Sequence, residues 1–510
     1  MQNIIVFFYP DAKGDYIIPP YAFLYLERAI RDLDLRVVIL DEKLDTDWEQ
    51  QVNKMAPEIL MAGVSVVLGN QITGAVHFSG IIKQNGDIPV IWGGWFPTWK
   101  PEVCLNEEYA DFVVSGQGEA GFSFIVRNLL ESKSIVEEIN HTTIKNLKFE
   151  NVRNKVLISQ VEAQDFNEWP DIRYDLIDIR KYVSYSEGKG ILRYFATAGC
   201  PNRCNFCFLS SSWKGKWFSR PVEKVINDIR YFISESSDIQ YIIFEDNDLF
   251  HDRNFILSFS HALINNNLNI QWSGSAHIGD FLKTYSEEDI KIMKLSGCRS
   301  IASGAESGDQ QIIDLLNKNL LVSDIVRFVF LLSRYNITPC FSFMVLFPGN
   351  PQKDLLATLK LIMKLIRIDP SLVIFLNIYA PSINNIFLKR AIKSGYRPPE
   401  SLAGFEKFEL KPQNMPWITT SLLKKMKYFG LFYFRFYSKN LFRFSYRYNS
   451  LPEYIIHFLV WPFNKIRFYF GITNITFLGW LYCKIFIKKE KEWPANDSLN
   501  KSIIIQYEKK

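Results

Sequence analysis

The sequence predicts an α/β protein: a doubly wound, Rossmann-like sheet, then a partial (β/α)6 barrel of the TIM type, then a helical region rich in aromatic and basic residues. Apolar runs without polar alternation recur along most of the chain, separated by amphipathic stretches. Such strands are buried on both faces and are typical of parallel sheets covered by helices. The 510 residues, 48% hydrophobic and 22% charged, suffice for two or three globular domains.

The first domain is predicted over residues 1–150, followed by a polar linker over 151–185. Its expected strands and helices alternate. The strands are expected at 4–9, 36–40, 59–67, 89–94 and 111–116, and the helices near 21–32, 46–54, 70–84 and 119–131. Glycines gather at the carboxyl ends of three strands, the edge at which parallel sheets bind ligands. One glycine there indicates only a tight turn, but the cluster favours a ligand site.

The second domain is predicted over residues 186–400, where six apolar runs are each followed by a helical segment. Six βα units in series favour a parallel barrel, or part of one, with its chemistry at the carboxyl ends of the strands.

Cys200, Cys204 and Cys207 lie within eight residues, directly after the first barrel strand. A structural zinc site needs four closed ligands, and electron-transfer clusters normally use four cysteines. Three thiolates can instead bind three irons of a 4Fe–4S cubane, which leaves the fourth iron open to a substrate. The other four cysteines are scattered, which suits a reducing cytoplasm better than a disulfide framework. We also read no signal peptide and expect a cytoplasmic protein.

The C-x-x-x-C-x-x-C spacing, with Phe206 before the last cysteine, resembles the radical S-adenosylmethionine (SAM) superfamily. The resemblance implies that the open iron chelates SAM and that Phe206 lies against its adenine. "IIFEDNDLF" and "SGAESG" resemble the second- and fourth-strand motifs of that family. The implied SAM contacts are Glu245, Asp246, Asn247, Ser303 and Glu306. The alternative for each carboxylate is a helix cap or an ion pair.

The fifth-strand segment "FMVLFPGNP" departs from the family pattern, because Leu346 replaces a glycine and Asn350 a glutamate. We therefore expect no SAM contact there. His251 and His277 also fall near strand ends. Both are interpreted as structural, and no catalytic proton acceptor is assigned.

Segments of the first domain resemble the cobalamin-binding domain that precedes the barrel in one large radical SAM subfamily. The implied cobalamin contacts are Ser65, Leu68, Gly69, Gly93, Gly94, Gly116 and Glu119. Other cobalamin proteins supply a cobalt-ligating histidine after the first strand, where this chain has none. "AVHFSG" half-matches that motif, but His77 falls within a predicted helix. No histidine ligand to cobalt is expected.

Together these resemblances imply an enzyme that cleaves SAM reductively, with a flavodoxin or ferredoxin as electron donor. The 5′-deoxyadenosyl radical would take hydrogen from an unactivated carbon of a small-molecule or lipid-like substrate. Methylation through methylcobalamin is the commonest outcome implied, and oxidative cyclisation or ring rearrangement is the alternative. A cobalamin or iron–sulfur sensor is the alternative of another class, but it has no use for an open iron. Transfer-RNA methylthiotransferases carry a second cysteine triplet before the barrel. This chain has only Cys104 there, so no nucleic-acid partner is expected.

The C-terminal region, residues 401–510, carries the charge imbalance of the chain. Residues 421–489 hold twelve Lys and Arg against one acid, a charge of +11, and the net charge of +5 leaves −6 for the rest. Bases interleaved with aromatic residues suit an anionic membrane surface, such as the inner membrane. A helical cap over the barrel is the alternative. The uncharged run 468–483 is shorter than the ~20 residues that span a bilayer, so it predicts an interfacial or buried helix.

Overall fold

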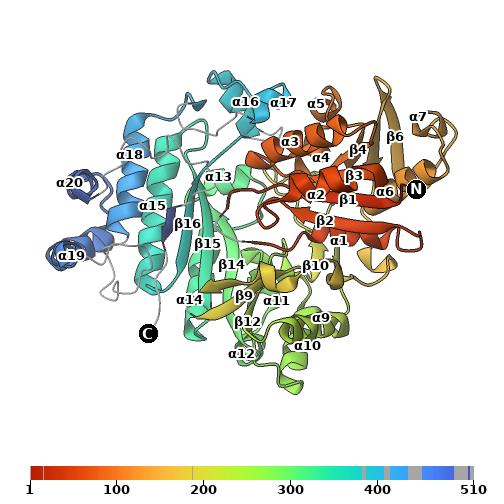
Figure 1. Cartoon of the computed structure of the whole chain (residues 1–510). Helices are drawn as coiled ribbons and strands as arrows, with labels where there is room; N and C mark the ends of the chain where they lie inside the picture. Colours follow the sequence, from red (N-terminus) through yellow and green to blue (C-terminus); the bar gives the residue numbers. More distant parts are fainter. Residues whose placement is uncertain are drawn as a thin grey trace.

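The computed structural model describes residues 2–14, 17–186, 188–381, 386–406, 414–434, 451–486 and 503–505. Figure 1 shows two sheets in separate halves of the molecule, with the helices of residues 420–428, 451–470 and 477–486 on the side away from the N-terminal half.

The first sheet has the strand order β2-β1-β3-β4-β5-β7-β6. Its strands are β1 (Ile4–Tyr9), β2 (Arg36–Asp41), β3 (Ile59–Ser65), β4 (Val90–Gly93), β5 (Phe112–Ser115), β6 (Leu147–Val152) and β7 (Lys155–Gln160). Ile4, Val6 and Phe8 lie in one hydrophobic core, with helices α2 (Trp48–Met55) and α3 (Asn70–Gln84). Ile5 and Phe7 lie in a second core, with α1 (Tyr21–Arg28) and α6 (Glu119–Leu130). Helices therefore cover both faces, and the doubly wound prediction is confirmed.

The first domain extends further than expected. We placed its end at residue 150, but β6 and β7 form an antiparallel hairpin and β7 pairs in parallel with β5. Arg153 and Asn154 make the turn with positive φ, as two-residue hairpin turns require. Strand β6 has no fully buried residue and lacks an apolar run, so the pattern did not reveal it. The connection to the barrel therefore begins after Gln160.

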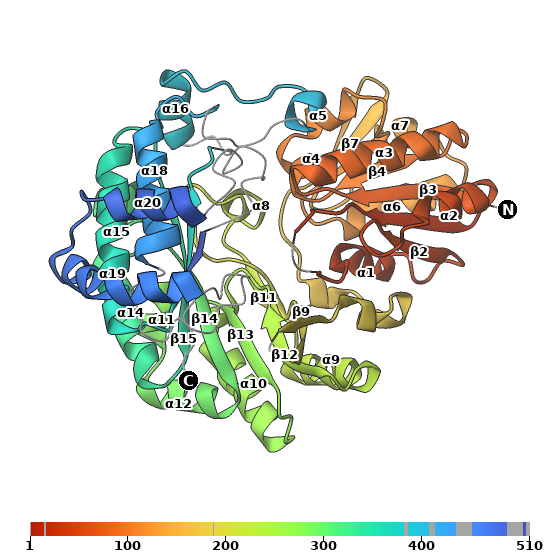
Figure 2. The ribbon, with the colours of Figure 1, turned by 60° about the vertical axis from the view of Figure 1, so that its left-hand side comes forward.

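The second sheet contains six parallel strands in sequence order, flanked by an antiparallel strand at each edge. The parallel strands are β9 (Lys189–Tyr194), β12 (Ile239–Phe244), β13 (Gln271–Ser275), β14 (Cys298–Glu306), β15 (Thr338–Val345) and β16 (Val373–Ile378). The edge strands are β8 (Ser184–Ser186) and β17 (Ile503–Ile505). The covering helices include α9 (Val222–Glu235), α10 (Arg253–Asn265), α12 (Glu287–Leu295), α14 (Val322–Arg334) and α15 (Pro351–Ile368). The sheet stays open, so the partial barrel is confirmed; Figure 2 shows its curl.

The C-terminal region is divided between both halves of the molecule. Helix α16 (Ile386–Lys393) is followed by α17 (Leu402–Glu406), whose Leu402 and Phe405 lie in a core of the first domain. Helix α18 (Thr420–Tyr428) continues into a π-helical turn (Phe429–Tyr433) over α15.

The helix expected over 468–483 is instead two helices, α19 (Leu451–Phe470) and α20 (Phe477–Phe486). The chain reverses at Gly471, whose φ of 62° suits glycine. Among the described residues, no helix is long and apolar enough to cross a membrane.

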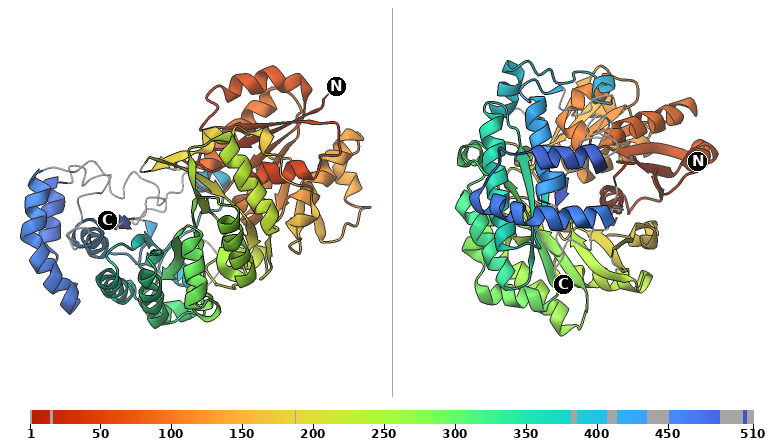
Figure 3. Two further views of the ribbon diagram at one scale, coloured as in Figure 1. Left: turned by 90° about the horizontal axis from the view of Figure 1, so that it is seen from below. Right: turned by 90° about the vertical axis from the view of Figure 1, so that its left-hand side faces the viewer.

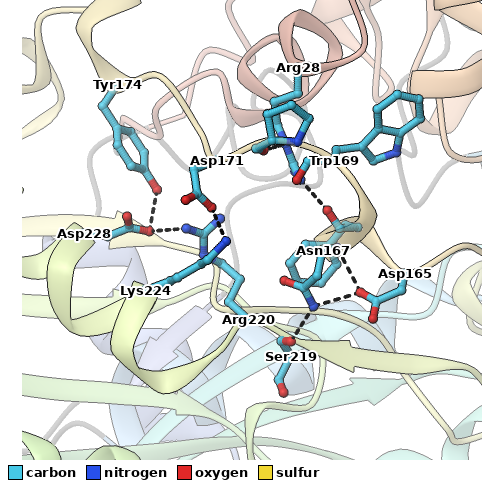
Figure 4. Close-up of polar contacts among 12 residues, drawn as sticks. Arg28, Asp165, Asn167, Trp169, Asp171, Tyr174, Ser219, Arg220, Lys224 and Asp228 are labelled. Carbon is cyan, nitrogen blue, oxygen red and sulfur yellow. Dashed lines mark hydrogen bonds and ion pairs between the residues drawn. The ribbon is translucent and has the colours of Figure 1, made fainter.

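A polar clasp fixes the segment between the two sheets, as Figure 4 shows. The Arg28 guanidinium of α1 donates to the carbonyls of Phe166, Trp169 and Pro170. On the barrel side, Asn167 donates to the Ser219 carbonyl at 2.8 Å. Further contacts follow, of Asp171 with Lys224 and of Tyr174 and Arg220 with Asp228. The clasp joins the first domain to the barrel.

Candidate active site at the strand ends

The cysteine loop begins after β10 (Thr197–Gly199), which pairs with β11 (Trp217–Ser219). A Cβ on Gly199 would lie 2.3 Å from the Lys216 carbonyl oxygen, so only glycine fits between the two strands. The far side of the loop is tied to helix α13 (Gln310–Leu315), which follows β14. The Asn205 amide donates to the Leu316 carbonyl at 2.9 Å, and Asn317 donates to the Arg203 carbonyl at 3.0 Å.

The three thiols lie near enough to one another for their charges to interact. Cys204 is buried, and Cys200 and Cys207 are half-buried. Burial, with a smaller contribution from the charge of Cys207, raises the pKa of Cys200 and of Cys204 to about 11. Coordination to iron would offset this burial, since metal ligands bind as thiolates. No three His, Cys, Asp or Glu side chains among the described residues surround a single metal ion. A cubane needs no such arrangement, because each thiolate binds a different iron.

Lys318 lies beside the cysteines and was not predicted. Its ammonium pairs with Glu306 and lies 5.7 Å from the centre of the Phe206 ring. Both charged groups are buried. Burial alone would lower the pKa of Lys318, but the charges of Glu306, Cys204 and Cys207 outweigh it and raise that pKa. Lys318 follows β14 by twelve residues and belongs to no motif, so only the fold reveals it.

The three consecutive residues predicted at the end of β12 have different surroundings. Asp246 is 1% exposed and accepts hydrogen bonds from the backbone amides of Ala196 and Thr197, just before the cysteine loop. Burial raises its pKa to about 7. Glu245 pairs with Arg193 of β9, and Asn247 is exposed. Asp246 therefore holds the segment that leads into the cysteine loop. Glu245 and Asn247 lie nearer to solvent.

Ser303 is the second residue predicted from the fourth-strand motif, and its surroundings indicate whether this end of the sheet suits a polar ligand. Its hydroxyl is buried, yet it makes no hydrogen bond to another residue. Such a group normally has a partner, and a missing one marks a place where a ligand or water binds. Together with a paired buried cation and three thiols, it gives a donor set that fits a 4Fe–4S cluster and the polar groups of SAM.

Leu346, which directly follows β15, replaces a glycine of the family pattern and keeps a glycine-like backbone conformation. Its φ of 66° is the left-handed conformation that favours glycine, the residue we expected from the family pattern. The buried Asp354 of α15 holds this backbone by accepting the Leu346 amide at 2.7 Å and the Ser307 hydroxyl at 2.6 Å. Asn350 caps α15 through the Lys353 amide. Asp354, also unpredicted, thus joins the ends of β14 and β15.

Both histidines near the strand ends have structural surroundings. The buried His277 approaches the Lys318 carbonyl at 2.7 Å through Nε2 and Asp280 at 2.9 Å through Nδ1. His251 lies against the Trp217 ring. Asp248 is buried beside His277, and burial raises its pKa to about 6.

The first domain presents a glycine-lined apolar edge at the ends of β3 and β4. The Val66 amide donates to Gly93 and the Phe96 amide donates to Val66, so the two loops lie against each other. A Cβ on Gly94 (φ 98°) would lie 2.7 Å from the Val66 oxygen. The neighbouring Leu68 is 37% exposed. Around Gly69 the space is open, a Cβ on Gly93 would only touch the Val114 oxygen at 3.8 Å, and Ser65 is half-buried beside them. This open apolar surface fits a flat macrocycle such as the corrin ring.

The other implied cobalamin residues lie at the end of β5. The Gly116 amide donates to the Thr98 hydroxyl at 2.9 Å, and Gln117 bonds in both directions with the backbone of Gln164. Glu119 is buried at the start of α6, and burial raises its pKa. His77 lies within α3, as expected, and pairs with Glu49 at 3.4 Å.

The two predicted cofactor edges meet. Trp95, directly after Gly94, is 51% exposed and stacks on Phe208, directly after Cys207, with 5.8 Å between ring centres. The apolar edge of the first domain therefore adjoins the cysteine loop of the barrel. Neither ring belongs to a sequence motif, so this contact was not predicted.

Comparison with known families identifies both of the domains that carry these edges. The radical SAM superfamily matches residues 194–362, and the B12 binding domain matches residues 11–126. The chain is therefore a radical SAM enzyme with a cobalamin-binding domain. Its cofactors are a 4Fe–4S cluster, SAM and cobalamin.

Similar proteins include methyltransferases. An uncharacterised methyltransferase of Pyrococcus horikoshii is 25% identical over 352 residues, 68% of this chain and 73% of that protein. The anaerobic magnesium-protoporphyrin IX monomethyl ester cyclase of Rubrivivax gelatinosus is 22% identical, over 55% of this chain and 49% of that protein.

Two solved structures share the fold. The radical SAM methyltransferase TsrM of Kitasatospora setae, with cobalamin and a 4Fe–4S cluster bound, has a TM-score of 0.61 at 14% identity. The match covers 78% of this chain and 76% of TsrM. The cobalamin-dependent radical SAM enzyme OxsB has a TM-score of 0.59 at 16% identity, over 71% of this chain and 52% of OxsB.

Proposed function

We propose that this enzyme methylates an unactivated carbon, with a 4Fe–4S cluster bound by Cys200, Cys204 and Cys207. The observation that carries the proposal is the stack of Trp95 on Phe208, because it brings the edge suited to cobalamin against the cysteine loop. A methyl donor beside the site of radical formation is what such a reaction requires. The relatives named as methyltransferases, one of Pyrococcus horikoshii and the cytidylyl-2-hydroxyethylphosphonate methyltransferase of Streptomyces wedmorensis, support the same outcome.

The barrel residues bind and orient SAM in this proposal. When bound, the cluster would supply the electron for SAM cleavage, and a flavodoxin or ferredoxin would be its electron donor. Lys318 and Glu306 offer opposite charges to the methionine part of SAM, and Ser303 offers its free hydroxyl. Phe206 packs on the adenine. Glu245 and Asn247 bind from the end of β12, while Asp246 acts by positioning the cysteine loop.

The first domain would hold cobalamin, which carries the methyl group. Gly69 faces open space that would accommodate the corrin ring, Gly94 allows the two loops to lie close together, and Gly93, Ser65 and Leu68 would border the ring. Gly116 and Glu119 complete the edge at the end of β5. The loop after β1 contains no histidine, so no imidazole ligand to cobalt would come from this loop.

We propose a cytoplasmic enzyme that contacts an anionic membrane peripherally. The basic C-terminal region supports such contact, and a membrane surface favours a lipid-like substrate.

The stoichiometry of SAM consumption tests methylation against cyclisation, the outcome named for the Rubrivivax relative. Methylation consumes one SAM for the radical and one for the methyl group, so 5′-deoxyadenosine and S-adenosylhomocysteine should form together. Cyclisation or rearrangement would yield no S-adenosylhomocysteine. Extracts of cells lacking the gene supply the substrate, and methyl-labelled SAM identifies the product by mass spectrometry.

Replacement of the three cysteines by alanine is the companion experiment. The triple variant should lose the iron–sulfur absorption and form no 5′-deoxyadenosine. Replacement of the buried Cys298 is the matched control and should leave the iron content unchanged. A triple variant with its full iron complement would contradict the proposed ligands.

A further inference from the structure

Helices α19 and α20 form a hairpin on the outer surface of the C-terminal region, over α15 and α18, as Figure 3 shows. The inner face of α19 is buried through Val460, Asn464 and Phe468. The inner face of α20 is buried at Tyr482, whose ring contacts Phe432. The hairpin is thus firmly packed on the protein from one side.

Arg467 fixes the turn of the hairpin. Its guanidinium is buried, lies 3.9 Å from the centre of the Tyr433 ring and donates to the carbonyls of Ile472 and Ile475. The Gly479 amide also donates to the Tyr433 hydroxyl at 3.1 Å. The outer side chains are therefore presented by a rigid support.

The outer face of the hairpin is apolar and exposed. Leu459, Phe463, Ile466 and Phe470 follow one another at spacings of four, three and four, which places them on one face of α19. Phe463 is 66% exposed and Phe470 is 70% exposed. In the turn and on α20, Ile475, Phe477 and Trp480 are exposed as well, and the Phe477 and Trp480 rings contact each other. So many exposed apolar side chains on two successive helices mark an interaction surface.

The charges beside this face are of one sign. Lys465 lies over the Trp461 ring at 4.3 Å, and Lys484 lies over the Trp480 ring at 5.1 Å. The sequence contains no acidic residue between Glu453 and Glu490. Tryptophan rings with adjacent lysines are typical of the boundary between lipid headgroups and acyl chains. Six further bases of this region lie outside the described residues: Arg435, Lys439, Arg443, Arg447, Lys488 and Lys489.

We propose that the outer face of α19 and α20 inserts into the headgroup layer of an anionic membrane. Phe463, Phe470 and Phe477 enter the apolar boundary, and Lys465 and Lys484 meet the lipid charges. The hairpin lies in the surface and does not cross it, since neither helix can span a bilayer. The positive charge selects a lipid surface over a second copy of this chain, because two such faces would repel each other. The inference rests on the proposed membrane contact and locates it.

Vesicle flotation of the cluster-reconstituted full chain tests this surface. The vesicles contain phosphatidylcholine alone or mixed with phosphatidylglycerol, at low and high salt. The chain should float with the anionic vesicles at low salt. The double variant Phe463→Ser/Phe470→Ser should lower the partition coefficient about tenfold or more, since each ring loses its apolar contact. Phe330→Ser on α14 removes an equally exposed ring (59%) elsewhere and is the matched control.

Charge is tested separately with Lys465→Glu/Lys484→Glu, which should abolish the preference for anionic vesicles. Cleavage of SAM by the same samples with a chemical reductant should be unchanged in every variant, so a failed enzyme assignment is distinguishable from a failed membrane surface. Three results would overturn the inference: no binding to either vesicle, equal loss with Phe330→Ser, or a dimer that the double variant abolishes without vesicle binding.

Discussion

Burial gives the two ion pairs at the strand ends different energetic weight. Glu306 and Lys318 are each less than 10% exposed, whereas Arg193 and Glu245 are 19% and 28% exposed. A buried charge that loses its partner costs much more than a half-exposed one, because water cannot replace the partner. Variants of the two ion pairs, compared with each other, therefore show which pair contributes more to the stability of the site.

We predict that Lys318→Met destabilises the apo-protein by about 3–5 kcal/mol, because it leaves Glu306 buried without its cation. Arg193→Met should cost about 1 kcal/mol or less, since Glu245 reaches water. Thermal unfolding of both variants measures the difference, and Lys318→Arg should recover most of the loss. Equal shifts in the two variants would show that the Glu306 pair carries no special weight.

Asp246 predicts a pH dependence. Its pKa in the folded protein is about 7, above the value of about 3.9 in an unfolded chain. Between these values the folded state holds a proton that the unfolded state has lost, so stability falls as pH rises from about 4 to 7.

We expect Asp246→Asn to flatten this fall, by up to about 1.4 kcal/mol per pH unit. The asparagine keeps an acceptor for the amides of Ala196 and Thr197. Melting temperatures between pH 5 and 7 provide the measurement. Asp32→Asn is the control, because Arg127 lowers the pKa of Asp32 and places its titration below that window. An unchanged slope in Asp246→Asn would refute the assignment.

At the scale of elements, the ends of β14 and β15 depend on α15. Asp354 binds both ends, and Leu346 adopts a left-handed conformation that costs roughly 1–2 kcal/mol in a non-glycine residue. Its side chain is fully buried, so burial opposes backbone strain at one position.

We predict that Leu346→Gly destabilises the protein by about 2 kcal/mol, because losing a buried leucine costs about 3–5 kcal/mol and exceeds the strain relieved. Asn336→Gly is the matched control: φ there is 54°, but the side chain is exposed. Its melting temperature should hardly change. A stabilised Leu346→Gly would mean that strain outweighs packing.

Elements with a strong apolar period were predictable, and those that depend on partners were not. The buried strands and the helices between them follow from local pattern, and the cysteine spacing placed the cluster loop. In the β6/β7 hairpin only β7 has a short buried apolar run, and β6 has no fully buried residue, so the pair did not stand out in the sequence. Lys318 and Asp354 act through partners distant in the sequence. The packing of α17 on the first domain was also not predictable, because a helix of five residues is too short to show a hydrophobic period.

At the scale of the whole molecule, two contacts set the distance between the cofactor edges. The Trp95–Phe208 stack joins the edges directly, and the linker clasp holds the domains from the other side. Arg28 is central to the clasp, because one guanidinium satisfies three carbonyls of the linker (Figure 4). The Phe166 carbonyl is buried, and a buried carbonyl without a donor costs about 1–3 kcal/mol.

Arg28→Ala should therefore open the linker locally and separate radical formation from methyl transfer. Trypsin cleavage at the exposed Arg173, Arg180 and Lys181 should accelerate about tenfold, since about 1.4 kcal/mol of local opening energy corresponds to that factor. Arg127→Ala, which loses the exposed ion pair with Asp32, is the control. The Arg28 variant should still form 5′-deoxyadenosine but less S-adenosylhomocysteine for each molecule of it, because the two edges no longer keep their relative position. A digestion rate and product ratio like those of Arg127→Ala would show that the stack of Trp95 on Phe208 alone aligns the domains.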